Sequence, residues 1–229
     1  MIFIGLDDTD TIESRGTGHL ARQIAAALAD AGYTISGVTR HQLLVDPRVP
    51  YTKNNSSATI LIDAGGESHI AHLLGQAHTI ILTEHQSGSD PGLCIAEIVP
   101  ETVTEFGHKA QRQVVDKKEA DRLAEASGVT LLGLGGTHDG IIGALAAVGL
   151  AASGNDGRYV LVGRSRELSG LQPVSALLEA GIAAVQTQDG EPVAEGLVLT
   201  DKLRPARRGG QPIAVVEWAG DHWLPLKLD

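Results

Sequence analysis

The longest apolar run of the sequence, Ile141 to Ala152, is the feature that most constrains how the chain folds. The run is alanine-rich and far too short to span a bilayer, so we expect an apolar helix within a globular domain. It follows the apolar stretch Val129 to Leu134, which has the pattern of a buried strand, and then the glycine-rich segment GLGGTHDG. The predicted order here is therefore strand, glycine-rich turn and helix.

The glycine-rich turn matches neither common phosphate-binding motif. No Gly-Lys-Ser/Thr closes it as in a Walker A loop, and His138 occupies the sixth place that glycine takes in GxGxxG. Two interpretations stay open: a generic phosphate cradle, or a tight turn followed by close helix packing at Gly143 and Gly149. His138 and Asp139 are likewise either chemical groups or ordinary turn and cap residues.

Three acids follow the first predicted strand, which covers Ile2 to Leu6. The carboxylates of Asp7, Asp8 and Asp10 repel one another unless a cation neutralises them, and oxygen ligands suit Mg²⁺. Ligands of such sheets tend to lie beyond the carboxyl ends of strands. The alternative is a turn rich in Asp and Thr, in which Asp10 or Thr17 caps the next helix. We favour the cation site, because the turn needs one acid and the cation site uses all three. If the strand continued, alternation would send Asp7 and Asp8 to opposite faces of the sheet.

Apolar periodicity predicts alternating strands and helices along the rest of the chain. Strands are expected at 34–45, 58–64, 93–99 and 159–163, and helices at 18–31, 68–77, 102–126 and 173–180. The segment 102–126 is expected to form two helices, and Asp116 followed by Glu119 resembles a capping box. An apolar run covers 79–83, and short β-type stretches follow Ser165, at 183–188, 196–199, 212–218 and 223–228. We therefore predict an α/β or α+β fold with mixed sheets and a β-rich tail.

The start of the first predicted helix offers a second candidate site. Gly16 and Gly18 flank Thr17 there, and the backbone N–H groups of a helix start favour anions. From composition, Thr17 is a phosphate contact, a nucleophile or an N-cap.

Two further segments contain cations. Lys53 and Asn55 belong to the polar loop YTKNNSS, which could hold the phosphate or ribose of a nucleotide or could be a plain surface loop. Arg204, Arg207 and Arg208 form the only dense basic cluster, which suits phosphate recognition but also suits a solvated hairpin tip.

Charge and cysteine content exclude several classes of protein. The net charge is −10, from 28 acids and 18 Lys and Arg, which argues against a whole-surface nucleic-acid binder. The single cysteine, Cys94, excludes an internal disulfide and a Cys-based zinc site, and it is expected to be a core residue. The N-terminus shows no signal-peptide pattern. We expect a cytoplasmic protein without zinc and without a membrane segment.

Several of these segments, taken in order, resemble a known family. The blocks are GLDDTD, TGHLA, DPRVPYTKNNSSATILI, SDPGLCI and DGIIGALAAVG. Over residues 1–165 they look like the N-terminal half of the archaeal tRNA agmatinylcytidine synthetases, which modify a wobble cytidine of an isoleucine tRNA. The resemblance implies a kinase-like α/β core that uses ATP, with an associated ferredoxin-like α+β part. Residues 1–165 would be the nucleotide-binding region, and 166–229 a smaller β-rich ferredoxin-like or accessory region.

The resemblance also implies roles for individual residues. Asp7, Asp8 and Asp10 match aspartates that hold Mg²⁺ and ATP in the family, and Thr17 matches a threonine that becomes phosphorylated there. Asp8 and Thr17 are thus the implied catalytic residues, and Mg²⁺ and ATP the implied cofactors. Other positions border the same nucleotide site by analogy: Gly16, Gly18, Lys53, Asn55, Gly136, Gly140 and Gly143.

The function implied is that of an ATP- and Mg²⁺-dependent phosphotransferase or ligase acting on an unidentified acceptor. The family continues into an OB-fold and a zinc ribbon, whereas this sequence ends at Asp229, so we expect a stand-alone, bacterial-type relative. Two alternatives stay open. One is a non-catalytic nucleotide or small-ligand binding protein. The other is an RNA-modification subunit that needs a separate RNA-binding partner, with the arginine cluster as its docking patch. The sequence also leaves open whether the protein is an oligomer.

Overall fold

The chain forms two compact units in a computed structural model that describes residues 1–11, 13, 15–51, 54–63 and 69–228. Unit 1 is Met1–Ser153 and Unit 2 is Gly154–Asp229. The boundary predicted after residue 165 lies inside Unit 2, and the division into separate domains stays a prediction. Each unit is described by itself.

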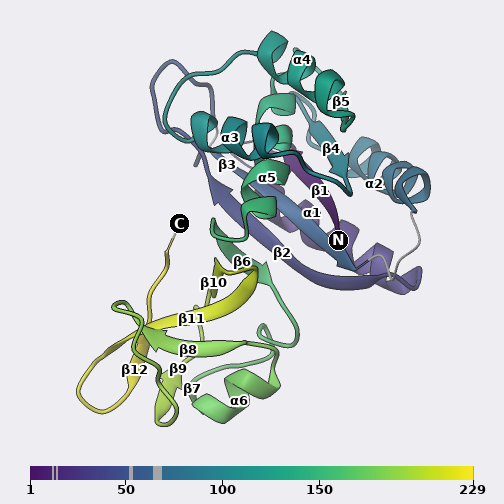
Figure 1. Cartoon of the computed structure of the whole chain (residues 1–229). Helices are drawn as coiled ribbons and strands as arrows, with labels where there is room; N and C mark the ends of the chain where they lie inside the picture. The colour runs from purple at the N-terminus through teal and green to yellow at the C-terminus, as the bar shows by residue number, and fades with distance from the viewer. Residues whose placement is uncertain (12, 14, 52–53, 64–68, 229) are drawn as a thin grey trace. The chain divides into compact units, whose positions relative to one another are not determined.

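Unit 1 contains a sheet of antiparallel strands in the order β5-β4-β1-β3-β2 (Figure 1). The strands are β1 (Ile2–Asp7), β2 (Thr34–Gln42), β3 (Ser56–Asp63), β4 (Gly92–Ala96) and β5 (Thr130–Gly133). The helices are α1 (Thr17–Asp30), α2 (Ile70–Glu84), α3 (Glu101–Ala110), α4 (Lys117–Ser127) and α5 (Gly140–Ser153). The predicted mixture of helices and strands is confirmed.

The first six elements have the ferredoxin-like arrangement. Strands β4-β1-β3-β2 are antiparallel neighbours, and α1 and α2 are the crossovers of a split βαβ unit. The family resemblance implied a ferredoxin-like or accessory region at 166–229, and that assignment stays a prediction; the ferredoxin-like strand order described here occurs in Unit 1. An apolar pattern identifies a strand but not its neighbour, since pairing depends on whether a hairpin or a crossover connects two strands.

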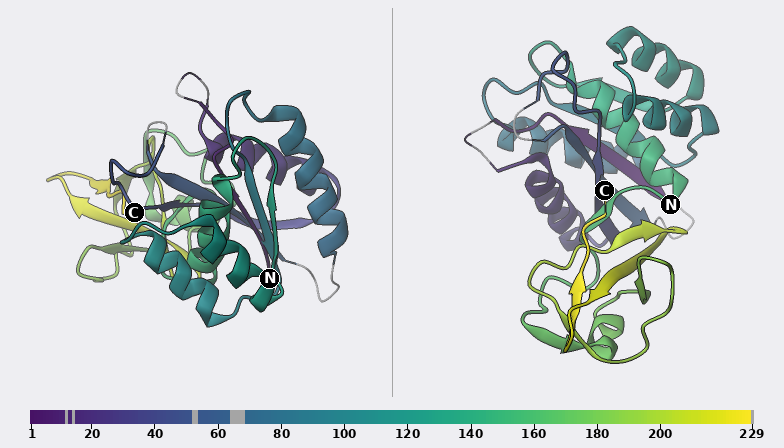
Figure 2. Two further views of the ribbon diagram at one scale, coloured as in Figure 1. Left: turned by 90° about the horizontal axis from the view of Figure 1, so that it is seen from above. Right: turned by 90° about the vertical axis from the view of Figure 1, so that its left-hand side faces the viewer.

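Helices cover both faces of this sheet. Helices α1 and α2 lie on one face, and α3, α4 and α5 lie on the other (Figure 2). Helix α5 is enclosed by the sheet, α3 and α4, and its central residues from Ala144 to Val148 have no exposed surface. A helix that is apolar all round must be buried in this way, which explains the long apolar run.

Glycines allow the backbone of α5 to pack directly against the backbones of β1, β4 and α3. A Cβ atom built on Gly5 of β1 would lie 2.2 Å from the carbonyl oxygen of Ala144. A Cβ atom on Gly92 of β4 would lie 2.1 Å from the Gly140 oxygen, and one on Gly149 would lie 2.1 Å from the Val103 oxygen. Real Cβ atoms do not approach that closely, so the close-packing interpretation of Gly149 is confirmed.

Two local predictions can be compared with the helices. Helices α3 and α4 confirm the division of 102–126, and the Glu119 backbone N–H donates to the Asp116 carboxylate at 2.9 Å, as in a capping box. The run 79–83, in contrast, continues α2 rather than forming a separate element. Leu73, Ala77 and Ile81 are all buried, so the four-residue spacing of the first part of the helix extends through this run.

Unit 2 contains short strands and one short helix. Its elements are β6 (Arg158–Leu161), β7 (Leu171–Pro173), α6 (Val174–Glu179), β8 (Ala184–Thr187), β9 (Leu197–Leu199), β10 (Ala206–Arg208), β11 (Gln211–Trp218) and β12 (Trp223–Pro225). The strands follow the order β6-β10-β11-β12-β9-β7, and β8 pairs with β11 (Figure 1). The sequence pattern did not predict β7 and β10, which have three residues each.

The backbone contact at Gly5 predicts a specific loss of stability. Gly5→Ala should lower the free energy of unfolding by roughly 1–3 kcal/mol or more, because the new methyl group overpacks the seam between β1 and α5. Urea denaturation would measure this change, provided that the slope of unfolding free energy against urea concentration is the same for variant and wild type.

Gly75→Ala is the matched control, because Gly75 lies within α2 and a Cβ atom there meets nothing within 4 Å. This variant should be neutral or more stable by up to about 1 kcal/mol, since alanine has the higher helix propensity. Equal stability of Gly5→Ala and wild type would contradict the close contact.

Candidate functional site

A pocket of about 820 Å³ opens in Unit 1 beside the end of β1. Its acidic part is lined by Asp7, Asp8, Asp10, Asp90 and Asp139. Its apolar part comes from the segment between β2 and β3 and from the segment between α3 and α4, and it includes Leu43, Val49, Tyr51, Val114 and Val115. The pocket therefore combines clustered carboxylates with an apolar wall.

Asp7 is the last residue of β1, and its carboxylate lies against the first turns of α5. A Cβ atom on Gly143 would lie 1.7 Å from Asp7 Oδ2, so glycine at that position provides the space for the carboxylate. Burial raises the pKa of Asp7 to about 7, against a backbone hydrogen bond at Asp8, and the charges of Asp8 and Asp10 raise it further. The site therefore favours the neutral carboxyl of Asp7 over the ionised carboxylate.

Asp8 reaches the same pocket because the strand stops before it. Its φ angle is 49°, in the left-handed region that few non-glycine residues adopt. The alternation expected for a continuing strand therefore does not apply, and Asp7 and Asp8 both line the pocket. Burial, followed by the charges of Asp90 and Asp10, raises the pKa of Asp8 to about 6.

Asp10 also lines the pocket, but it holds the start of α1. Asp10 Oδ1 accepts hydrogen bonds from the Thr17 backbone N–H at 3.0 Å and from the Thr17 hydroxyl at 2.9 Å. Thr17 is only 5% exposed and does not line the pocket. Gly16, the N-cap of α1, and Gly18 also lie outside the pocket lining. The helix-start residues are thus not brought together with Asp7 and Asp8 around one cavity.

The three acids do not form a ready-made metal site. Within the described ranges, no group of three or more His, Cys, Asp or Glu side chains is arranged to hold a metal ion. A metal role for the acids stays a prediction, and Asp7 and Asp8 are the two carboxylates whose charge the site leaves least compensated.

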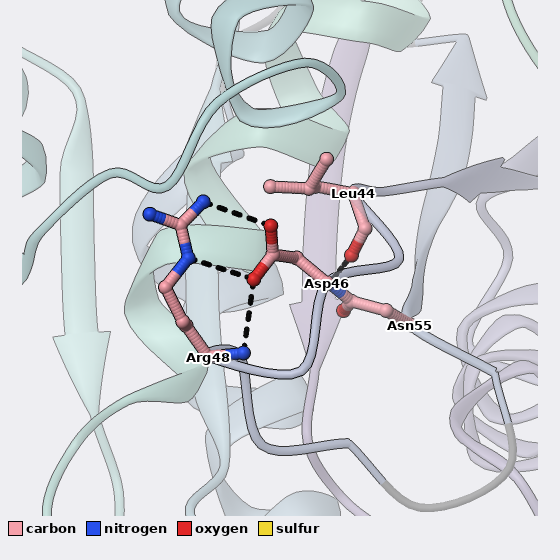
Figure 3. A network of polar contacts seen from close by, with 4 residues as sticks. All are labelled: Leu44, Asp46, Arg48 and Asn55. Atoms are coloured by element: carbon pink, nitrogen blue, oxygen red, sulfur yellow. Dashed lines mark hydrogen bonds and ion pairs between the residues drawn. The ribbon is translucent and has the colours of Figure 1, made fainter.

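Asn55 lines the pocket and closes the segment between β2 and β3. Its side-chain N–H donates to the Leu44 oxygen at 2.7 Å (Figure 3). Its backbone oxygen accepts from the Leu43 N–H at 2.8 Å. In the same segment the Arg48 guanidinium donates to the Asp46 carboxylate at 2.8 Å, and Arg48 also lines the pocket. Lys53 lies outside the described residues.

The glycine-rich turn before α5 is closed by an acid that the sequence pattern did not identify, Asp90. The Thr137 backbone N–H donates to Asp90 Oδ1 at 2.9 Å, and a Cβ atom on Gly136 would lie 1.3 Å from that oxygen. Gly136 does not line the pocket, whereas Gly140 and Gly143 do. The Thr137 hydroxyl lies 2.6 Å from a carboxylate oxygen of Asp90 and 2.6 Å from one of Asp139. The tight-turn interpretation accounts for Gly136.

Lys117 was not among the predicted site residues, whereas Asp139 was a candidate that the sequence left open between a chemical group and a turn residue. Lys117 forms an ion pair with Asp139 at 2.9 Å, and both line the pocket. The hydrogen bond from Thr137 lowers the pKa of Asp139, and the hydrogen bond and positive charge of Lys117 lower it further. Asp90 reaches the pocket through strand register, because Asp7 of β1 pairs with Gly92 of β4. The block SDPGLCI contained Asp90, but nothing local in it marks an acid of the site.

Comparisons with curated proteins identify relatives of one kind. The chain is 28% identical over 159 residues to tRNA(Ile2) 2-agmatinylcytidine synthetase TiaS of Pyrococcus horikoshii, a match that covers 65% of this chain and 35% of the relative. It is 30% identical over 156 residues to the protein of the same name from Methanopyrus kandleri, covering 66% of this chain and 34% of the relative. The chain thus spans about a third of the length of these relatives. No protein-family model matches it.

Solved structures show the same fold over the same share of the chain. A structure described as a tRNA fluorescent labeling enzyme superposes with a TM-score of 0.57 and 25% identity, over 65% of this chain and 35% of that one. A TiaS–tRNA(Ile2)–ATP complex superposes with a TM-score of 0.57 and 24% identity, over 65% of this chain and 36% of that one.

Among the described residues, no helix has both the length and the apolar character needed to cross a membrane.

The raised pKa of Asp7 predicts a pH dependence of stability without ligand. The unfolded carboxyl ionises near 3.8, whereas the folded one retains its proton up to about 7. The contribution of Asp7 to stability is therefore fully present below about pH 4 and is lost as the pH rises to about 7. Asp7→Asn should flatten this decline and raise the free energy of unfolding at about pH 8 by roughly 1 kcal/mol or more. Urea denaturation at a series of pH values measures it.

Asp121→Asn, which removes one exposed acid of α4, is the control and should retain the wild-type profile. The assignment fails if Asp7→Asn shows the same pH profile as wild type.

Proposed function

Because the chain is a relative of the tRNA(Ile2) 2-agmatinylcytidine synthetases, we propose that Unit 1 binds ATP with Mg²⁺ and activates an acceptor oxygen by phosphoryl transfer. The observation that carries this proposal is the pocket in which the carboxylates of Asp7 and Asp8 meet without sufficient compensating charge. A bound cation is the simplest way to stabilise both in their ionised form.

The donor set of the pocket fits Mg²⁺ bound together with a nucleotide. Mg²⁺ in such sites uses one or two carboxylates and completes its octahedron with phosphate oxygens and water. Asp7 and Asp8 would supply the carboxylates, so a third acid is unnecessary and Asp10 can remain bonded to Thr17. Mg²⁺, when bound, supplies neutralisation of charge on the transferred phosphoryl group.

The rest of the pocket offers complementary surfaces for a nucleotide. Tyr51, Val114 and Val115 form an apolar wall that suits a base, and the volume lies within the range of small-molecule sites. Arg48 and Lys117 line the same pocket and would supply positive charge to the phosphates after exchanging their present partners, Asp46 and Asp139.

We propose an RNA nucleoside as the acceptor. Two similarities support this acceptor: the relatives are tRNA(Ile2) 2-agmatinylcytidine synthetases, and one solved neighbour is a complex of TiaS with tRNA(Ile2) and ATP. Since the chain spans about a third of these relatives, their complete reaction does not follow for it.

A second candidate function is nucleotide binding without turnover, and Thr17 favours it. The hydroxyl of Thr17 is buried and bonded to Asp10 and to the Thr9 hydroxyl, at 2.9 Å and 3.2 Å. Phosphorylation at this oxygen would require the start of α1 to open. A protein that binds ATP and transfers no phosphoryl group would fit this geometry.

Nucleotide affinity tests the main proposal. Isothermal titration should detect ATP binding to wild type that strengthens with Mg²⁺. Asp8→Asn should weaken binding in Mg²⁺ at least about tenfold, equivalent to about 1.4 kcal/mol, with a smaller effect in EDTA. Asp121→Asn removes the same charge from α4 and should bind as wild type does. A wild type without affinity for ATP would overturn the proposal.

The structural role of the Thr17 hydroxyl can be tested separately. We expect Thr17→Val to lower the free energy of unfolding by about 1 kcal/mol or more, because the hydrogen bonds of the Thr17 hydroxyl with Asp10 and Thr9 are lost. We also expect the intact mass of wild type to stay unchanged after incubation with ATP and Mg²⁺. A mass increase of one phosphoryl group, absent in Thr17→Val and retained in Thr17→Ser, would contradict the structural role.

A further inference from the structure

In the β6–β10 ribbon of Unit 2, the predicted arginine cluster is separated, because Arg207 is buried whereas Arg204 and Arg208 are partly exposed. Arg207 is 6% exposed, donates hydrogen bonds to the Tyr159 hydroxyl and the Gly210 oxygen, and lies 5.9 Å from the centre of the Tyr159 ring. It is a core residue that joins β10 to β6, so it is not available to a ligand. The three arginines therefore do not form one docking patch.

The other face of this ribbon brings a different set of arginines together. Ala206 pairs with Arg158, and the Tyr159 N–H donates to the Pro205 oxygen at 2.7 Å, which extends the pairing beyond β10. Side chains alternate across a strand, so Arg204 lies on the same face as Ala206 and Arg158, opposite to the face of Arg207. Arg158 and Arg204 are thus diagonal neighbours across two antiparallel chains.

A third arginine, Arg166, folds back onto β6 from the segment that follows this strand. The Arg166 guanidinium donates to the Val160 oxygen at 3.1 Å, which fixes it beside β6. Burial, followed by the charges of Arg166 and Arg158, lowers the pKa of Arg204. The charges of Arg158 and Arg166 thus act on Arg204, and the register of the ribbon and the Val160 contact place the three side chains around the same part of it.

We propose that Arg158, Arg166 and Arg204 form a phosphate-binding site of Unit 2. Guanidinium groups present planar pairs of donors that match phosphate oxygens, and three of them can contact different oxygens of one group. Arg158 and Arg204 are half-buried and Arg166 is exposed, so a ligand can reach donors held by the ribbon. In a chain of net charge −10 such a cluster is a localised attraction for phosphate. The ligand is a phosphate of an RNA backbone or of a small molecule.

The test removes two of the three charges and uses two probes. The double variant Arg166→Gln and Arg204→Gln is compared with Lys118→Gln and Arg122→Gln, which removes the same charge from exposed positions of α4. The probes are a fluorescein-labelled single-stranded RNA, followed by anisotropy without nucleotide, and inorganic pyrophosphate, followed by calorimetry. Thermal unfolding verifies that each variant folds, and the exposed Arg166→Gln alone serves if the double variant does not.

We expect the arginine variant to lose affinity for at least one probe by about tenfold or more, while the α4 variant binds as wild type does. If RNA is the ligand, the salt dependence of binding should decrease by about 0.7 in slope for each phosphate contact removed. Loss of RNA binding alone assigns the site to an RNA backbone, and loss of pyrophosphate binding alone or of both assigns it to phosphate groups in general.

The proposal is overturned if wild type binds neither probe, if the arginine variant binds both as wild type does, or if the α4 variant loses as much affinity. None of these outcomes depends on ATP binding by Unit 1, because the RNA titration contains no nucleotide and the ATP titration of wild type is separate.

Discussion

Backbone-to-backbone packing of α5 on β1 and β4 is the constraint on which the rest of Unit 1 depends. Gly5 and Gly92 remove side chains from the strands where α5 crosses them, and the crossing places the start of α5 beside the end of β1. Asp7 is thereby enclosed next to Gly143. The same contact that buries the apolar helix therefore produces the desolvated carboxylate on which the proposed chemistry rests.

The acids of the pocket have different electrostatic roles. Asp10 and Asp90 accept backbone N–H groups, from Thr17 and Thr137, so each closes a turn as it lines the cavity. Asp7 and Asp8 have raised pKa values instead, chiefly through burial. Structural and chemical interpretations of an aspartate cluster are thus not exclusive, and they separate residue by residue.

The sequence predicted the class of fold and most of its elements, because long apolar patterns report helices and buried strands. It did not predict strand order, which depends on connections. It placed Asp7 and Asp8 on opposite faces if the strand continued, because a positive φ at Asp8 leaves no trace in a residue pattern. Asp90 was missed since only the pairing of β1 with β4 brings it to the site. The arginine cluster was read as contiguous, whereas alternation along β10 buries Arg207.

The glycine contacts of α5 also limit how Unit 1 can respond to a ligand. Closure by shear requires a packed helix to slide along its sheet. A one-residue slide of α5 would replace Gly140 by Ile141 at the Gly92 contact, where the present distance leaves no room for a Cβ atom. Shear of α5 is therefore blocked at the floor of the pocket. The described residues of the β2–β3 and α3–α4 segments, which form the walls of the pocket, include no glycine contact of this kind.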